Sequence, residues 1–192
     1  AELPSGANLG MLREVPGAAS RLVMQTQPSP TANAGVAFAQ QPSVRLYDQF
    51  GNFCANNSST VVSAARGLGS GILQGTTNVT AVAGLVTFAN LSHNVATNIT
   101  LTFSASGATG TNSSSIAISA AAADRLVFIT QPGSSTYGST LSAQPVLKTR
   151  DPFGNDSTVG LGASKLVSLA VSTGTGSLLG TTSLDIGTAA GN

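Results

Sequence analysis

An internal repeat constrains this chain more than any other feature of its sequence. The segment RLVMQTQP that begins at Arg21 returns as RLVFITQP from Arg125, 104 positions later. Three further blocks recur in the same order at nearly the same spacing, which indicates two copies of one structural unit. These blocks are Gln41-Pro42 with Gln144-Pro145, Asp48-Gln49-Phe50-Gly51-Asn52 with Asp151-Pro152-Phe153-Gly154-Asn155, and Gly75-Thr76-Thr77 with Gly180-Thr181-Thr182.

The spacing of these blocks divides the chain into three parts. We predict an N-terminal extension at residues 1–20, which serves as a linker or as a donor strand. A first repeat follows at residues 21–121 and a second at residues 122–192, joined near Ala121 to Asp124.

Each copy carries the polar and apolar alternation that is typical of β-strands. Ile99, Leu101 and Phe103 alternate with Thr and Ser side chains, which places the three apolar residues on one face. Clusters of Gly, Pro, Asn and Ser bound such segments, and no ten-residue segment shows the 3.6-residue period of a helix. The strands predicted in the first copy are residues 21–27, 43–49, 59–66, 71–74, 84–91, 98–105 and 114–120.

Seven short strands in about 100 residues are typical of an immunoglobulin-like sandwich. We therefore predict an all-β fold of tandem immunoglobulin-like antiparallel β-sandwiches. The second copy continues for only ten residues after Thr182, so it lacks the equivalents of the strands at Leu85, Ile99 and Ile116. Either the chain is a fragment of a longer protein, or strands of another chain complete the second repeat. In the second case we expect residues Met11 to Val15 to be the donor strand.

Composition excludes several classes of partner. Charged residues make up 8% of the chain and the net charge is +1, without any run of like charge. We therefore expect no binding to nucleic acid or to an anionic membrane surface. Because no segment approaches the roughly 18 apolar residues of a membrane helix, we also expect no membrane insertion.

The number and placement of the acidic, His and Cys residues argue against catalysis. The seven acidic residues are spread over different repeats and loops, so no pair of carboxylates is set up for glycoside hydrolysis. The single histidine, His93, is predicted to lie on an exposed loop, far in sequence from Cys54. No cluster of His, Cys and carboxylate residues has the spacing of a zinc site. We expect a chain that is not an enzyme and has no cofactor, in which Cys54 is a small loop residue or an intermolecular thiol link.

The repeated Asp-x-Phe-Gly-Asn motif predicts a tight turn. In this interpretation the Asp side chain bonds the backbone two residues on, Gly supplies a positive φ, and Phe covers the end of the sandwich. The alternative is a calcium site at Asp48 or Asp151 with a nearby Asn carbonyl, although calcium usually requires several carboxylates. The turn residues are Asp48, Phe50, Gly51 and Asn52 in the first copy and Asp151, Phe153, Gly154 and Asn155 in the second.

Seven Asn-x-Ser/Thr sequences are compatible with N-glycosylation. The favoured acceptors are Asn56, Asn90 and Asn112, because we predict all three in loops. Sugars at these positions would cover a surface that carries few charges.

The order Arg-Leu-Val, Thr-Gln-Pro, Gln-Pro and Asp-x-Phe-Gly-Asn resembles the bacterial immunoglobulin-like repeats of surface adhesins, the group that includes invasin and intimin stalks. The resemblance covers residues 21–192. Like those repeats, the chain lacks the bridged cysteines and core tryptophan of antibody domains. The resemblance implies secretion, tandem arrays and a spacer or adhesive role, and therefore an extracellular or cell-surface location.

These observations favour an extracellular structural protein whose repeats form a surface stalk or filament. Its partners would be copies of itself or neighbouring immunoglobulin-like repeats, and assembly could involve strand exchange between subunits. One alternative is an adhesin or carbohydrate-binding module for a glycan or other cell-surface ligand, although only Tyr47 and Tyr137 resemble sugar platforms. Another is a spacer of a larger secreted enzyme.

Overall fold

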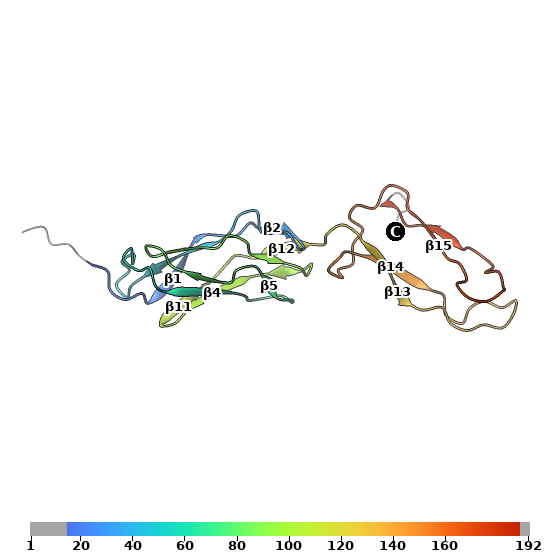
Figure 1. Cartoon of the computed structure of the whole chain (residues 1–192), viewed down its shortest axis with the longest axis horizontal. Coiled ribbons are helices and arrows are strands. Elements are labelled where there is room, and N and C mark those ends of the chain that lie inside the picture. The colour runs from blue at the N-terminus through green and yellow to red at the C-terminus, as the bar shows by residue number, and fades with distance from the viewer. Residues whose placement is uncertain (1–14, 189–192) are drawn as a thin grey trace, which may run out of the picture. The chain divides into compact units, whose positions relative to one another are not determined.

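The computed structural model describes residues 15–188, and the named elements in this range are all β-strands (Figure 1). The chain divides into two compact units after Ala117, a few residues before the expected junction at 121/122. Two short segments, residues 33–36 and 93–97, group with the second unit. The donor strand proposed from the sequence, Met11 to Val15, lies outside the described residues except for Val15.

The first unit is built on one large sheet and two small ones. The large sheet has seven strands in the order β6-β4-β10-β11-β1-β3-β7, the second sheet has the order β2-β12-β9, and β5 pairs with β8. The pairing of β1 with β11 is parallel. The strands are β1 (Arg21–Thr26), β2 (Thr31–Asn33), β3 (Ser43–Tyr47), β4 (Val61–Arg66), β5 (Leu73–Gln74), β6 (Asn78–Thr80), β7 (Leu85–Thr87), β8 (Ser92–His93), β9 (Asn98–Ile99), β10 (Leu101–Ala105), β11 (Ala108–Asn112) and β12 (Ile116–Ser119).

Apolar side chains at alternate strand positions fill the core of this unit. Leu101 and Phe103 of β10 are fully buried, whereas Ser104, the residue after Phe103, is exposed. The ring of Phe103 packs against that of Phe88 at a centroid distance of 5.3 Å. The prediction of an all-β chain of immunoglobulin-like sandwiches is confirmed, and each of the seven predicted segments contains a strand.

The sequence did not indicate β2, β6, β8 and β11. The clearest case is β11, ATGTN, which has no large apolar side chain and therefore no alternation to detect. Its place is fixed by backbone pairing with β10 on one side and β1 on the other. Long-range pairing of this kind cannot be seen in a local pattern.

The second unit contains two strand pairs that repeat the registers of the first. In β13 (Arg125–Thr130) and β14 (Val146–Arg150), Leu126 lies opposite Thr149, as Leu22 lies opposite Leu46 in β1 and β3. The register shift near the end of β13 also falls where β1 has one. The other pair joins β15 (Leu166–Ser168) to β16 (Ser183–Asp185).

The structure contains no membrane-spanning helix candidate within residues 15–188.

Candidate functional site

Asp48 organises the first of two related turns. Its Oδ1 accepts hydrogen bonds from the backbone N–H groups of Phe50, at 2.9 Å, and Asn52, at 2.8 Å. Its Oδ2 accepts one from the backbone N–H of Gly17, at 3.0 Å, and one from Asn52 Nδ2, at 3.1 Å. Gly51 has a φ of 89°, in the left-handed region that favours glycine. One carboxylate thus holds the turn closed and also binds the segment that leads into β1.

Asp151 forms the same arrangement in the second copy. Its Oδ1 accepts from the backbone N–H groups of Phe153 and Asn155, both at 2.9 Å. Its Oδ2 accepts from the backbone N–H of Ala121, at 3.0 Å, and from Asn155 Nδ2, at 2.7 Å. Gly154 has a φ of 92°. The two copies therefore share the complete donor set.

The bond from each Asp to the preceding segment was not predicted from the sequence. Gly17 lies four residues before Arg21, and Ala121 lies four residues before Arg125, so the bond falls at equivalent positions. About 30 residues separate each donor from its Asp. Because every residue except Pro has a backbone N–H, the residue type does not identify the donor. We refer to these two contacts, Asp48 with Gly17 and Asp151 with Ala121, as the entry bonds.

Hydrogen bonding controls the ionisation of both carboxylates. Burial raises the pKa of Asp48, but the bonds from Gly17, Asn52 and Phe50 outweigh burial and lower this pKa to about 2. At Asp151, burial again raises the pKa, and the bonds from Asn155, Ala121 and Phe153 bring it below its usual value. Four donors fill the lone-pair directions of each carboxylate, so the geometry favours the turn interpretation over a calcium site.

We expect the first unit to lose stability as the pH falls from about 4 to about 2. The folded pKa of Asp48, about 2, lies below the unfolded value of roughly 3.9, so the ionised form stabilises the fold above the unfolded value. This contribution disappears as the carboxylate protonates in the folded state. Melting temperatures measured by circular dichroism across this range should fall less steeply for Asp48→Asn than for the unchanged protein.

Asp124→Asn is the matched control for this pH dependence, because the Asp124 side chain is half exposed and pairs with Arg125 at the surface. Equal slopes for Asp48→Asn and the unchanged protein between pH 2 and 4 would show that the Asp48 carboxylate does not set the acid sensitivity.

The prediction that the turn phenylalanines cover the ends of the sandwiches was wrong for Phe50, whereas the Phe153 ring packs on Gly35. Phe50 is 78% exposed and Phe153 is 45% exposed. The hydrogen bonds of Asp48 fix the turn backbone, but they do not bury the Phe50 side chain. Phe53 packs on the strand instead, with its ring 5.9 Å from that of Tyr47 and 5.0 Å from the Arg45 guanidinium.

His93 and Cys54 are both buried. The prediction that His93 lies on an exposed loop was wrong, because the pairing of β8 with β5 takes it fully into the interior. Cys54 is likewise fully buried, with Sγ 3.6 Å from the Gly17 carbonyl oxygen, and burial raises the pKa of its thiol. A buried thiol of this kind is unsuited to an intermolecular link.

The three favoured glycosylation positions differ in how free their side chains are. Asn56 and Asn112 are exposed, although Asn112 is the last residue of β11 and not part of a loop. Asn90 is exposed, but its amide is engaged with Thr76. Oδ1 accepts from the Thr76 backbone N–H at 2.8 Å, and Nδ2 donates to Thr76 Oγ1 at 3.2 Å. Asn56 and Asn112 are therefore the better acceptors.

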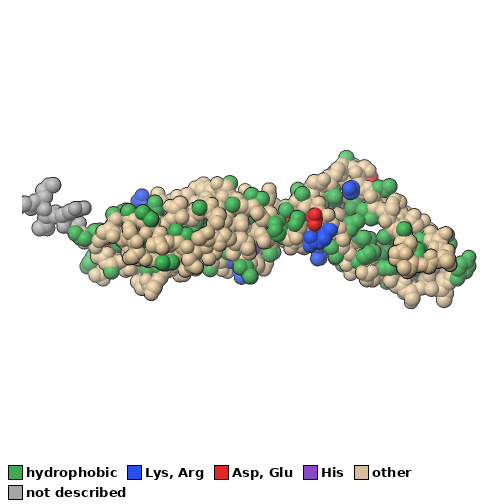
Figure 2. Space-filling view, viewed as in Figure 1, with side chains coloured by type: hydrophobic (Ala, Val, Ile, Leu, Met, Phe, Trp, Pro, Cys, Tyr) green, Lys and Arg blue, Asp and Glu red, His purple; other side chains and the backbone are tan. Residues whose placement is uncertain are grey.

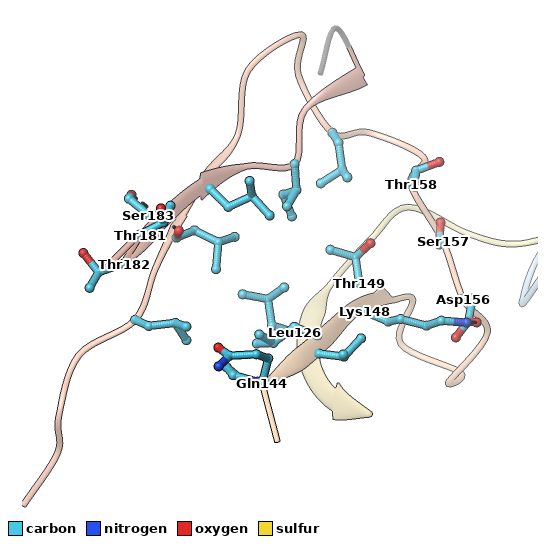
Figure 3. Close-up of a pocket in the computed structure, with 18 residues that line it drawn as sticks. Leu126, Gln144, Lys148, Thr149, Asp156, Ser157, Thr158, Thr181, Thr182 and Ser183 are labelled. Carbon is cyan, nitrogen blue, oxygen red and sulfur yellow. Dashed lines mark hydrogen bonds and ion pairs between the residues drawn. The ribbon is translucent and has the colours of Figure 1, made fainter. Parts of the chain in front are cut away.

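A groove of about 630 Å³ lies in the second unit between the β13–β14 pair and the β15–β16 pair (Figure 3). Leu126 and Gln144 contribute to one wall, and Thr181 to Ser183 contribute to the opposite wall. Much of the lining is aliphatic, and Figure 2 shows hydrophobic side chains on the visible face of this unit. The aliphatic lining residues are Leu126, Val146, Leu147, Leu161, Val167, Leu169, Leu184 and Ile186.

The groove corresponds to core positions of the first unit. Leu22, at the position equivalent to Leu126, is 4% exposed, whereas Leu126 is 45% exposed. Val62 is fully buried, whereas its equivalent Val167 is half-buried. In the first unit, β10 lies beside β4 and supplies buried side chains to this core. The groove therefore has the position that the sandwich interior has in the first unit.

No family model matches this chain, and no curated protein matches it. Among solved structures, the extracellular domains 3–5 of Drosophila OTK are similar at 13% sequence identity and a TM-score of 0.32. The match covers 88% of this chain and 53% of that one, so the chain spans about half the length of that structure. The resemblance to bacterial adhesin repeats accordingly rests on the sequence motifs.

Proposed function

We propose that this chain belongs to an extracellular structural protein in which immunoglobulin-like repeats build a surface stalk or filament. The observation that carries this proposal is the pair of entry bonds. Asp48 with Gly17 and Asp151 with Ala121 give each repeat the same attachment to the residues that precede it. A tandem array needs such a reproducible attachment, whereas a pocket-based function does not.

The chemistry of the side chains supports a role without catalysis. Asp48 and Asp151 are committed to their turns, and Asp156 forms ion pairs with Lys148 and Arg150. Because these carboxylates already have structural partners, we infer that the chain has no enzymatic activity of its own. The extracellular location is supported by the sequence resemblance and by a surface that carries few charges.

We further propose that neighbouring subunits join by strand exchange, which the repeated all-β architecture supports. The binding of glycans, the main alternative, has weaker support, since Tyr47 packs between Phe53 and the Arg21 guanidinium and only Tyr137 is fully exposed.

Electron microscopy of the purified chain together with a glycan array tests this function. We expect concentration-dependent filaments or oligomers, and no saturable binding to any glycan. A chain that stays monomeric at all concentrations and binds one glycan class saturably would replace the structural proposal by the adhesin alternative.

A further inference from the structure

We infer that Cys54 and Ser157 complete the two entry bonds, because each donates a hydrogen bond to the carbonyl oxygen of the residue whose backbone N–H the Asp holds. Cys54 acts on Gly17, and Ser157 acts on Ala121. This inference rests on the proposed function, in which the entry bonds attach each repeat to the residues before it. It names the side chains that fix the direction of that attachment.

Cys54 and Ser157 occupy equivalent places in the two copies. Each lies six residues after the Asp of its turn, and both side chains are buried. The backbone N–H of Cys54 donates to the Leu46 carbonyl at 3.0 Å, and that of Ser157 donates to the Thr149 carbonyl, also at 3.0 Å. The strand that holds each residue therefore holds it at the same point.

Each side chain contacts the polar group of the entry residue that the Asp leaves free. Cys54 Sγ lies 3.6 Å from the Gly17 carbonyl oxygen, and Ser157 Oγ donates to the Ala121 carbonyl oxygen at 2.6 Å. The first contact is longer because sulfur is larger than oxygen and S–H is the weaker donor. Sγ also lies 3.8 Å from the Asn52 carbonyl oxygen, but a thiol has one hydrogen and Gly17 is nearer. In both copies the N–H and the C=O of one residue are thus held together.

The thiol of Cys54 keeps the proton that this bond requires. Burial raises its pKa, and the neighbouring Asp48 carboxylate raises it further. A thiolate could not donate, and this carboxylate would repel it. The environment therefore keeps Cys54 in the same donor state as the hydroxyl of Ser157.

Two bonds to one residue fix the backbone more completely than one bond does. A single hydrogen bond to the Gly17 N–H sets the position of that peptide group but lets the following peptide group rotate. A second bond to the Gly17 carbonyl fixes the following group as well, and with it the φ and ψ angles of Gly17. Gly17 and Ala121 lie outside the named strands, so no strand pairing fixes them. The two bonds together give each entry segment one direction.

The alternative is that Cys54 only fills space in the core, and the two possibilities rank substitutions differently. A hydroxyl at position 54 can replace the thiol as donor, as Ser157 shows, whereas an alanine cannot donate. If the thiol only filled space, Cys54→Ser would bury an unpaired hydroxyl and would be worse than Cys54→Ala.

Hydrogen exchange of the full 192-residue chain, followed by NMR, tests this ranking at the Gly17 amide. We expect this amide to keep its protection in Cys54→Ser. In Cys54→Ala it should exchange several-fold to about tenfold faster, which is the change that the loss of one hydrogen bond allows. The Leu46 amide, which donates to the Gly84 carbonyl, is the internal control and should stay protected in both variants.

The second copy provides an independent test, which decides the matter if Cys54→Ala does not fold. Ser157→Cys should keep the protection of the Ala121 amide, and Ser157→Ala should lose it. Ser157 Oγ also accepts from the Val159 N–H at 3.2 Å, so rescue by Ser157→Cys, and not the loss alone, identifies the donor role.

The inference is overturned if, in a folded chain, the Gly17 amide exchanges at the same rate in Cys54→Ala and Cys54→Ser, or faster in Cys54→Ser. Unchanged protection of the Ala121 amide in Ser157→Ala would overturn it too. The expected exchange rates in a chain that forms no filaments or oligomers would leave the inference standing and refute the proposed function. Filaments formed by a chain whose exchange rates ignore these substitutions would do the reverse.

Discussion

Replacing Phe103 by Ala is expected to reduce the free energy of unfolding of the first unit by about 3–5 kcal/mol. Phe103 is fully buried in the middle of β10 and packs its ring on that of Phe88. The substitution removes the apolar contacts of the ring and leaves a cavity that strands on both sides of β10 prevent from closing. Urea denaturation followed by circular dichroism measures the change.

Phe50→Ala is the matched control for Phe103→Ala. It removes the same side chain from a position that is 78% exposed, so the free energy of unfolding should change by no more than about 0.5 kcal/mol. Similar losses from the two substitutions would mean that β10 does not lie in the core and would contradict the sandwich as described.

Replacing Gly84 by Ala is expected to cost the first unit about 3 kcal/mol, through backbone strain and a steric clash. Gly84 has a φ of 75°, in the left-handed region, within the tight turn between Val82 and Leu85. A Cβ at this position would lie 2.4 Å from the Cys54 carbonyl oxygen, which belongs to the backbone and cannot move aside easily. The loss should appear as a lower denaturation midpoint in urea.

Gly107→Ala separates these two causes. Gly107 also has a φ of 75°, in the turn between β10 and β11, but a Cβ there would meet nothing within 4 Å. Only the cost of the left-handed conformation remains, and we expect about 1 kcal/mol. If both substitutions cost the same amount, the contact between Gly84 and the Cys54 carbonyl is not part of the folded structure.

At the two turns, the sequence predicts the local features but not the entry bonds. The local features follow from residue types within five positions: an Asp that accepts backbone N–H bonds and a Gly with a positive φ. The entry bonds to Gly17 and Ala121 do not, because their donors are backbone groups about 30 residues away. Yet these bonds are what make the motif relevant to a tandem array.

The sequence patterns predicted the burial of His93 and of Phe50 wrongly. His93 sits among polar residues and was expected at the surface, but the pairing of β8 with β5 buries it. Phe50 is a large aromatic residue and was expected to be covered, but its turn holds it in solvent. In both cases the pairing of distant segments, and not the residue's own character, decides its environment.

The sequence by itself determined the repeat, the β-strand content and the alternation that selects core residues such as Leu101 and Phe103, because these depend on periodicities of a few residues. The tertiary structure alone decided that β11 bridges β10 and β1, that the pairing of β8 with β5 buries His93, and that Asp48 and Asp151 bind Gly17 and Ala121. The physical reason is that register and burial arise from hydrogen bonds and contacts between segments far apart in the chain.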